Sequence, residues 1–234
     1  MNKLAELSVF FPAYNEEANI ERTVEKAIPI LDQVADKYEV LIVNDGSKDN
    51  TGAVAARLAE RYPFVRVITH EVNRGYGAAV KSGFYNSRYE WIVFTDSDGQ
   101  FDFSEVTNFI EKQEQTGADL VIGYYLKRAV GAFTVFSSKV WEFLVFVLFG
   151  LRATDTDCGF KMVRKAVIDK IPALEAERGP FITSEFLVKA RRAGFKIVEV
   201  GVRHYPRAGG KPTGRSLKVI ASGFSDLIRL RLSM

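Results

Sequence analysis

The stretch Phe94-Thr95-Asp96-Ser97-Asp98-Gly99-Gln100 continues the apolar run Trp91-Ile92-Val93-Phe94, which has the composition of a β-strand. Two carboxylates one residue apart form an oxygen-rich corner that suits Mg²⁺ or Mn²⁺, with water and phosphate oxygens completing the coordination. Gly99 allows a tight turn, and Gln100 adds a side-chain carbonyl oxygen. An aspartate turn that only caps the next helix fits the same residues. The rest of the chain decides between the two.

Apolar runs of strand length alternate with helically spaced segments in the first half of the chain. The expected strands cover 7–11, 38–43, 64–68, 91–95 and 120–123, and the expected helices begin near 16, 51, 78 and 106. This alternation predicts an α/β fold with a mostly parallel sheet covered on both faces. Ligands bind outside the carboxyl ends of such strands. The polar clusters follow the expected strands at 12–17, 44–50, 73–77 and 96–100. They predict one site at one edge of the sheet.

Beyond residue 123 the alternation is looser. We expect helices over 137–149, 165–171 and 185–193, strands near 161–163 and over 197–202, and a basic amphipathic helix over 217–232. The loop 203–215 combines glycines with four fixed cations, Arg203, Arg207, Lys211 and Arg215. This is the composition of a closing phosphate clamp, and a plain basic surface loop shares it.

The composition is that of a globular protein with one large domain or two small ones: 234 residues, 47% apolar and 26% charged. The single cysteine, Cys158, excludes an intrachain disulfide framework and a cysteine-rich zinc site, and is typical of a reducing compartment. The first residues lack the apolar core of a signal peptide. From Lys189 onward, 11 basic residues stand against 2 acidic ones, whereas the preceding part carries 21 against 27. The basic end indicates an anionic ligand or surface, or a solvated basic face.

The nearest approach to a membrane span is the uncharged apolar run 143–151, which is far shorter than the roughly 20 residues that a spanning helix needs. It fits either a buried core helix or an apolar face at the membrane interface. The basic tail lacks the interleaved aromatic residues that stack on bases, so nucleic acid is not an expected partner.

Six ordered segments are the most specific signal in the chain. They are Pro12-Ala-Tyr-Asn-Glu-Glu17, Asn44-Asp-Gly-Ser-Lys-Asp-Asn-Thr51, Asn73-Arg-Gly-Tyr-Gly-Ala-Ala79, Asp96-Ser-Asp98-Gly-Gln100, Asp157-Cys-Gly-Phe-Lys161 and His204-Tyr-Pro-Arg207. Together they resemble family-2 glycosyltransferases of the GT-A fold, and within that family dolichol-phosphate mannose synthases and their bacterial polyprenyl-phosphate relatives. The resemblance implies a single Rossmann-like domain over 1–234, with a nucleotide-sugar half (1–123), an acceptor half with the closing loop (124–216) and an amphipathic terminal helix (217–234).

The resemblance also implies roles for the matched residues. The donor nucleotide sugar would be bound by Pro12, Ala13, Tyr14, Glu16, Asp45, Asp96 and Arg207. Mg²⁺ or Mn²⁺ would be held by Asp98 and Gln100, with Asp96 beside it. Asp155 and Asp157 would face the acceptor and the transferred sugar and, with Asp98, form the catalytic group.

The acceptor side departs from the family pattern. The mannose synthases place arginines after the fifth strand to bind the acceptor phosphate, and Tyr125 and Thr134 occupy those places here. Arg128, Ser138 and Lys139 are the expected substitutes.

The kind of acceptor determines whether a base is needed. A lipid phosphate carries about −1.5 to −2 charges near neutral pH and attacks without a strong base. A sugar hydroxyl requires a carboxylate to take its proton, and the candidates are Asp157, Asp155 and Glu185.

The expected activity is metal-dependent, inverting transfer of mannose or glucose from a GDP- or UDP-sugar to a polyprenyl or dolichyl phosphate. The expected location is the cytoplasmic face of the membrane, by peripheral contact, with a separate membrane subunit as a further candidate partner. Two alternatives stay open. One is transfer to a sugar hydroxyl in polysaccharide synthesis, and the other is a non-catalytic subunit that binds nucleotide sugars.

Overall fold

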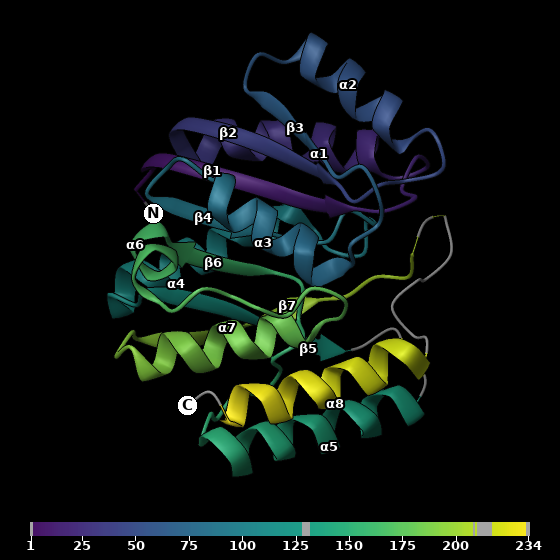
Figure 1. Cartoon of the computed structure of the whole chain (residues 1–234). Coiled ribbons are helices and arrows are strands. Elements are labelled where there is room, and N and C mark those ends of the chain that lie inside the picture. The colour runs from purple at the N-terminus through teal and green to yellow at the C-terminus, as the bar shows by residue number, and fades with distance from the viewer. Residues whose placement is uncertain (1, 128–131, 208, 210–216, 233–234) are drawn as a thin grey trace.

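The structure is a computed structural model that describes residues 2–127, 132–207, 209 and 217–232. Seven strands form one sheet in the order β3-β2-β1-β4-β6-β5-β7, with helices on both faces (Figure 1). The strands are β1 (Leu4–Ala13), β2 (Ala35–Asn44), β3 (Val65–Thr69), β4 (Trp91–Phe94), β5 (Leu120–Lys127), β6 (Lys161–Arg164) and β7 (Ile197–Arg203). The helices are α1 (Ile20–Val34), α2 (Thr51–Arg61), α3 (Tyr76–Asn86), α4 (Val106–Thr116), α5 (Ala132–Phe149), α6 (Lys165–Lys170), α7 (Phe181–Arg192) and α8 (Leu217–Leu232), with a 3₁₀ turn, η1 (Phe103–Glu105), before α4.

The order of the strands brings the polar clusters together, as the alternation predicts. β1 is central and runs parallel to both β2 and β4, so their carboxyl ends lie at one edge. β6 inserts antiparallel between β4 and β5, and Lys161 is thereby opposite Phe94. The segment before β6, from the second half of the chain, therefore reaches the corner that follows β4.

Two apolar cores cover the two faces of the sheet. One is built by α1, α2 and α4, with buried residues such as Val24, Val54 and Phe109. The other is built by α3, α6 and α7, with Phe84 and Phe186 packed near β1 and β4. Both cores are continuous with the strands, so the edge loops stand on a rigid base.

The first strand, expected over 7–11, continues through Pro12 to Ala13. The carbonyl of Phe10 accepts the N–H of Thr95 from the β4 side, and the carbonyl of Ala13 accepts the N–H of Asp45 from the β2 side. Because successive residues of a strand face opposite neighbours, Pro12 faces the β4 side, where β4 has already ended at Phe94. The missing N–H of proline therefore costs no ladder bond here.

Helices α5 and α8 lie side by side beyond α7, at the bottom of Figure 1. The Trp141 ring of α5 meets Phe181 of α7 and Phe224 of α8 edge to face, and Val145 is fully buried. The 143–151 run is thus neither wholly core nor wholly surface, because one side of α5 packs inward while Phe143 and Val147 are about 60% exposed. None of the helices in the described part of the chain has the length and apolar character to cross a membrane.

Candidate active site

The corner after β4 is fixed by backbone geometry. Gly99 has φ +72°, a left-handed conformation that side chains disfavour, and an Asp98 Oδ1 atom accepts the N–H of Gln100 at 3.0 Å. The Ser97 hydroxyl donates to the carbonyl of Pro12 at 2.7 Å, which ties the corner to the end of β1. The predicted cation-binding stretch is therefore a tight turn held against the central strand.

Asp96 is the more strongly perturbed of the two corner carboxylates. Tyr76, the first residue of α3, donates its hydroxyl to Oδ1 of Asp96 at 3.0 Å. On the other side Gly159 packs so closely that a Cβ there would collide with the Asp96 carboxylate. Burial and the neighbouring charge of Asp98 raise the pKa of Asp96 to about 7. A cation bound beside Asp96 and Asp98 would relieve the repulsion between their charges.

Arg207 reaches the same corner from the segment after β7. Its guanidinium pairs with the Glu16 carboxylate and lies 3.9 Å from an Asp98 oxygen. Gln100 holds this segment in place: its side-chain amide donates to the Tyr205 carbonyl, and its own carbonyl accepts the Tyr205 N–H, both at 2.8 Å. Burial raises the pKa of Glu16, although Asn19 and Arg207 oppose the shift. An arginine is thus already placed beside the predicted cation site.

Asp45 accepts four hydrogen bonds and is almost fully buried. The donors are the backbone N–H groups of Arg74 and Gly75 and the side chains of Asn73 and His70, at 2.6–3.0 Å. Asp45 therefore shapes the loop that carries Tyr76 toward Asp96. Its predicted contact with the nucleotide stays a prediction.

The remaining predicted donor residues lie where β1 ends. Pro12 and Ala13 are buried within β1, and Tyr14, just beyond it, is partly exposed. Their neighbours are tied to the β2 edge, since the Asn15 N–H donates to the Ser47 hydroxyl at 3.0 Å and the Glu16 N–H to the Thr51 hydroxyl at 2.7 Å. The ends of β1 and β2 thus form one surface beside the corner.

The turn 155–159 brings the second pair of aspartates to this edge. Asp155 is buried, and its Oδ1 accepts the N–H groups of Asp157 and Cys158 at 2.9 and 3.1 Å. Asp157 is partly exposed. Of the two predicted catalytic aspartates in this turn, Asp157 is therefore the one whose carboxylate is more open to a ligand, and Asp155 shapes the turn.

The predicted acceptor residues lie on or before α5, and only two are described. Arg128 lies outside the described residues, as do Lys211 and Arg215 of the predicted clamp. Lys139 donates to the Thr154 carbonyl at 2.9 Å and to Glu142 at 2.6 Å, one residue from Asp155. Ser138, next to it, is partly exposed. These contacts connect α5 to the 155–159 turn, and phosphate binding there stays a prediction.

Glu185 has a different role from the general base considered above. It lies inside α7, is 2% exposed, and accepts the backbone N–H groups of Glu175 and Ala176, both at 2.9 Å. Lys189, one turn later, pairs with it at 2.5 Å. Because both of its oxygens are engaged within the protein, Glu185 supports a loop and is not available to take a proton from an acceptor.

The donor set of the corner suits a hard divalent cation that is shared with a phosphate ligand. No group of three or more His, Cys, Asp and Glu side chains is gathered for a metal ion within 2–127, 132–207, 209 and 217–232. Asp96 and Asp98 supply two carboxylates of like charge, whose repulsion a cation would relieve. Mg²⁺ and Mn²⁺ are commonly bound by one or two carboxylates, with water and substrate phosphates as the other ligands. The residues present therefore fit such an ion.

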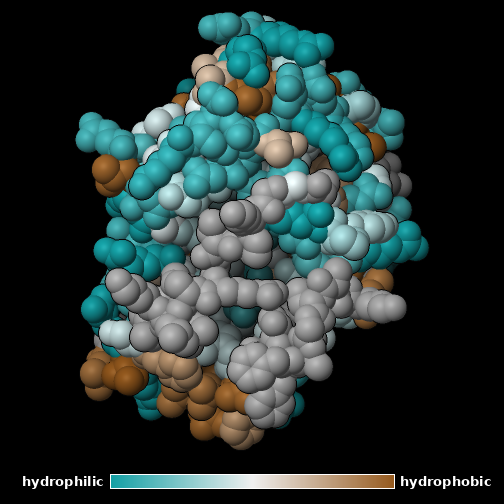
Figure 2. Space-filling view, turned by 90° about the vertical axis from the view of Figure 1, so that its right-hand side faces the viewer, coloured by the Kyte–Doolittle hydropathy of each residue, from teal (hydrophilic) through white to brown (hydrophobic). Residues whose placement is uncertain are grey.

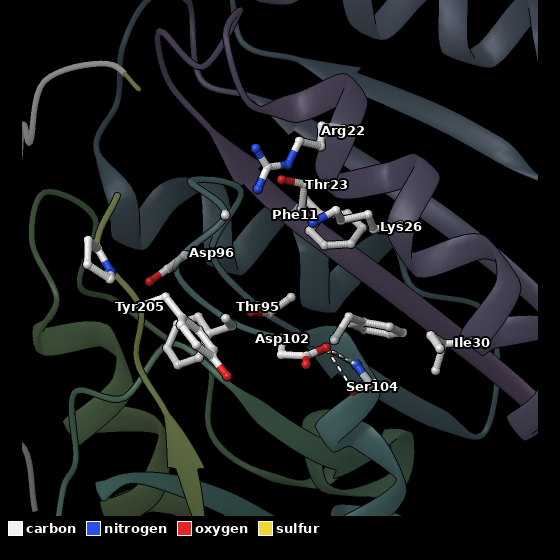
Figure 3. Close-up of a pocket in the computed structure, with 14 residues that line it drawn as sticks. Phe11, Arg22, Thr23, Lys26, Ile30, Thr95, Asp96, Asp102, Ser104 and Tyr205 are labelled. Carbon is white, nitrogen blue, oxygen red and sulfur yellow. Dashed lines mark hydrogen bonds between the residues drawn. The ribbon is translucent and has the colours of Figure 1, made fainter. Parts of the chain in front are cut away.

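A cavity of about 450 Å³ adjoins the corner on its α1 side (Figure 3). Gly99 is among its lining residues. Asp96 and Tyr205 lie on one side of it, and Arg22 and Lys26 of α1 reach toward it from the other. Tyr14 and Asp45 are not among its lining residues. We therefore define the candidate site by the hydrogen-bonded cluster around Asp96 and Asp98 and not by this cavity.

Three residues of the cluster received no role from the sequence. All three fall within the quoted motifs: Tyr76 and Gly159 contact Asp96, and Lys161 lies opposite Phe94, but no spacing rule indicated these positions. For Lys161 a signal existed: a charged residue directly precedes the apolar pair Met162-Val163 at the start of a short expected strand.

Comparison with known proteins agrees with the fold and the motifs. The model of the family described as "Glycosyl transferase family 2" matches residues 8–172. A dolichyl-phosphate beta-glucosyltransferase of Dictyostelium discoideum is 31% identical over 247 aligned positions, covering 96% of this chain and 73% of that protein. The Homo sapiens protein of the same name is 33% identical, covering 88% of this chain and 69% of its own length.

Solved structures share the fold at lower identity. Glucosyl-3-phosphoglycerate synthase from Mycobacterium tuberculosis in complex with phosphoglyceric acid has a TM-score of 0.71 and 23% identity, covering 98% of this chain and 79% of that one. The same enzyme in complex with Mg²⁺ and uridine diphosphate has a TM-score of 0.70 and 22% identity. The α/β sheet predicted from the alternation is confirmed by this likeness.

Proposed function

This chain belongs to glycosyl transferase family 2, and on that premise we propose that it transfers glucose from a nucleoside diphosphate glucose to a polyprenyl or dolichyl phosphate. The observation that carries the proposal is the cluster of Asp96, Asp98, Glu16 and Arg207 at the carboxyl edge of the sheet. The relatives at 31–33% identity are named for glucose and dolichyl phosphate, which favours glucose over mannose and a lipid phosphate over a sugar hydroxyl.

The donor diphosphate would be bound at the corner. Asp98 and Asp96 would hold Mg²⁺ or Mn²⁺, with the side-chain carbonyl oxygen of Gln100 as a further ligand. The bound ion would neutralise charge on the leaving diphosphate. Arg207 would exchange its contact with Glu16 for the diphosphate oxygens, since its guanidinium is already 3.9 Å from Asp98. The base and ribose would lie over Pro12, Ala13 and Tyr14, next to the loop that Asp45 organises.

Transfer would proceed by in-line displacement. An oxygen of the acceptor phosphate attacks the anomeric carbon, the bond from that carbon to the diphosphate oxygen breaks, and the configuration inverts. The phosphate enters largely ionised, so no residue has to remove a proton. Asp157, the more open aspartate of the 155–159 turn, would then orient the sugar. Lys139 and Ser138 would bind the acceptor phosphate, together with Arg128.

We propose that the acceptor half of the chain rests on the cytoplasmic face of a membrane. Seven large apolar residues of α5 and α8 are 39–83% exposed: Val140, Phe143, Phe146, Val147, Phe224, Ile228 and Leu232. They gather at the lower end of the space-filling view, below the mostly hydrophilic donor half (Figure 2). The exposed cations Lys139 and Arg229 lie on the same two helices, each paired with an acid of its own helix, and would meet anionic lipid there. A separate membrane subunit would bind the same face.

The test is product analysis with radiolabelled donors. The full chain is incubated with UDP-glucose, GDP-glucose or GDP-mannose, a polyprenyl phosphate, and Mg²⁺ or Mn²⁺. We expect label from a glucose donor in an organic-extractable lipid that mild acid hydrolyses. Label that appears only in water-soluble polysaccharide would establish the sugar-hydroxyl alternative. Tight donor binding without transfer or hydrolysis would establish the non-catalytic one.

A further inference from the structure

Lys161 is a lysine with no exposed surface at the inner end of the candidate site. It opens β6, where it is opposite Phe94 of β4 and Ile122 of β5, and its relative exposure is 0%. Its ammonium lies 5.5 Å from the centroid of the Phe94 ring and donates to the carbonyl of Cys158. A cationic side chain is therefore placed among the apolar strands of the sheet.

Burying an ammonium in such surroundings costs solvation free energy, which acidic or hydrogen-bonding partners must offset. Burial lowers the pKa of Lys161, and the surrounding acidic groups, among them Asp155, Asp157 and Asp96, oppose that shift. All three aspartates belong to the predicted site. The charge of Lys161 is thus offset by the site residues themselves.

The position of Lys161 connects two parts of the site. Its hydrogen bond fixes the Cys158 carbonyl, and Cys158 belongs to the 155–159 turn. The next residue, Gly159, packs directly on the Asp96 carboxylate. A shift of this turn would therefore move the surface on which Asp96 rests.

We propose that Lys161 is a positioning residue, whose buried ammonium holds the 155–159 turn and the Asp96 carboxylate in the one arrangement that receives the cation and the diphosphate. This inference rests on the proposed function. It adds a residue that contacts neither substrate nor metal and acts through the groups that do.

A second buried lysine provides the matched control. Lys189 is 5% exposed and pairs with Glu185 at 2.5 Å and with the Ala173 carbonyl at 2.6 Å. Its charge is neutralised within α7 by a residue outside the predicted site. Loss of either lysine leaves buried acidic groups uncompensated and lowers stability, but only loss of Lys161 removes the hydrogen bond to the Cys158 carbonyl in the 155–159 turn.

The experiment is calorimetric titration of the full chain with UDP in the presence of Mn²⁺, alongside near-ultraviolet circular dichroism and thermal unfolding. We expect Lys161→Met to raise the Kd for UDP by about 10–100-fold, the range typical of groups that orient metal ligands. Lys161→Arg keeps the charge and should recover part of that affinity. Lys189→Met should lower the Tm and bind UDP as the wild type does.

A folded Lys161→Met protein with the wild-type Kd would overturn the inference, and so would equal weakening by Lys161→Met and Lys189→Met. If the Met variant lacks a native spectrum, Lys161→Gln decides, because it keeps a donor for Cys158 and removes the charge, and weakened binding is again expected. Wild-type protein that binds neither UDP nor GDP with Mn²⁺ would instead overturn the proposed donor site.

Discussion

The two halves of the candidate site present different kinds of surface: the donor corner is a network of hydrogen-bonded polar groups, and the acceptor side carries an exposed apolar face. Around the donor corner, Asp45 accepts four hydrogen bonds, Arg207 is paired with Glu16, and Asp96 is bounded by Tyr76 and Gly159. On the acceptor side, α5 and α8 leave large apolar side chains exposed. A preorganised corner suits one small, highly charged donor, whereas an apolar face suits a long lipid in a membrane.

The donor corner should be the more sensitive to a single substitution. We expect Asp98→Ala to lower kcat/KM by on the order of 10³-fold, because it removes a carboxylate from the predicted cation site and with it stabilisation of the leaving group. Initial rates with a glucose donor and a polyprenyl phosphate measure this. Asp36→Ala, an exposed aspartate at the opposite edge of the sheet, is the matched control. Unchanged transfer by Asp98→Ala would leave the corner without its proposed role.

Substitution of Gly159, which packs against Asp96, should have the next largest effect on kcat/KM. In Gly159→Ala the new methyl group would meet the Asp96 carboxylate, so we expect a loss of about 10–100-fold in kcat/KM with the fold retained. Gly223→Ala is the control, because its Cβ would have only an ordinary 3.6 Å contact with Trp141. Equal activity of the two variants would show that the placement of Asp96 is not critical.

Substitutions on the exposed apolar face of α5 and α8 should weaken membrane binding and leave the folded core intact. Replacing Phe143 or Ile228 by Ser should lower partitioning onto anionic liposomes by on the order of tenfold each, since a buried apolar side chain contributes roughly 1.5–3 kcal/mol. Sedimentation with vesicles measures this. Val72→Ser, at an exposed residue of the donor half, should partition as the wild type does. If it weakens binding as much as Phe143→Ser, the α5–α8 face is not the contact.

The smallest expected effect is on pH dependence. The pKa of Asp96 is raised to about 7 by burial and by Asp98, so a proton competes with the cation below that pH. We expect the affinity for Mn²⁺ to fall as the pH decreases from about 7 toward 5, by at most about tenfold per pH unit. The raised pKa also means that this group's contribution to folding stability decreases as the pH rises from about 4 to 7. Calorimetry at several pH values, with Asp96→Asn as the comparison, tests both. A wild-type affinity for Mn²⁺ that does not change between pH 7 and 5 would contradict the raised pKa of Asp96 and its place in the cation site.

The sheet was predictable because each polar cluster follows an apolar run, a pattern that places Asp45 and Asp96 at one edge whatever the details. Two kinds of feature were not predictable. Pro12 is tolerated within β1 because β4 ends at Phe94, so no partner needs the missing N–H. The point at which a strand ends depends on the assembled sheet and not on its own sequence alone. Lys161 lies opposite Phe94, two residues before Asp96, only because β6 inserts antiparallel beside β4, a pairing between residues far apart in the chain.

The acceptor side was less predictable for a related reason. Periodicity showed that α5 is apolar but not which side would be covered, since that depends on the packing of Trp141 against α7 and α8. Glu185 likewise looked available as a base until its partners, Lys189 and the 175–176 backbone, were in place. The spacing of residues along one helix does not indicate which residues of other elements will contact it.

The central claim is that Asp96 and Asp98 hold a divalent cation that carries the donor diphosphate. Crystals grown with UDP and Mn²⁺, with diffraction recorded on either side of the manganese absorption edge, test it directly. The account predicts one anomalous peak within coordination distance of Asp98, with Asp96 beside it and the diphosphate between the ion and Arg207. Bound UDP without a peak there, or with the metal held by other residues, would contradict it.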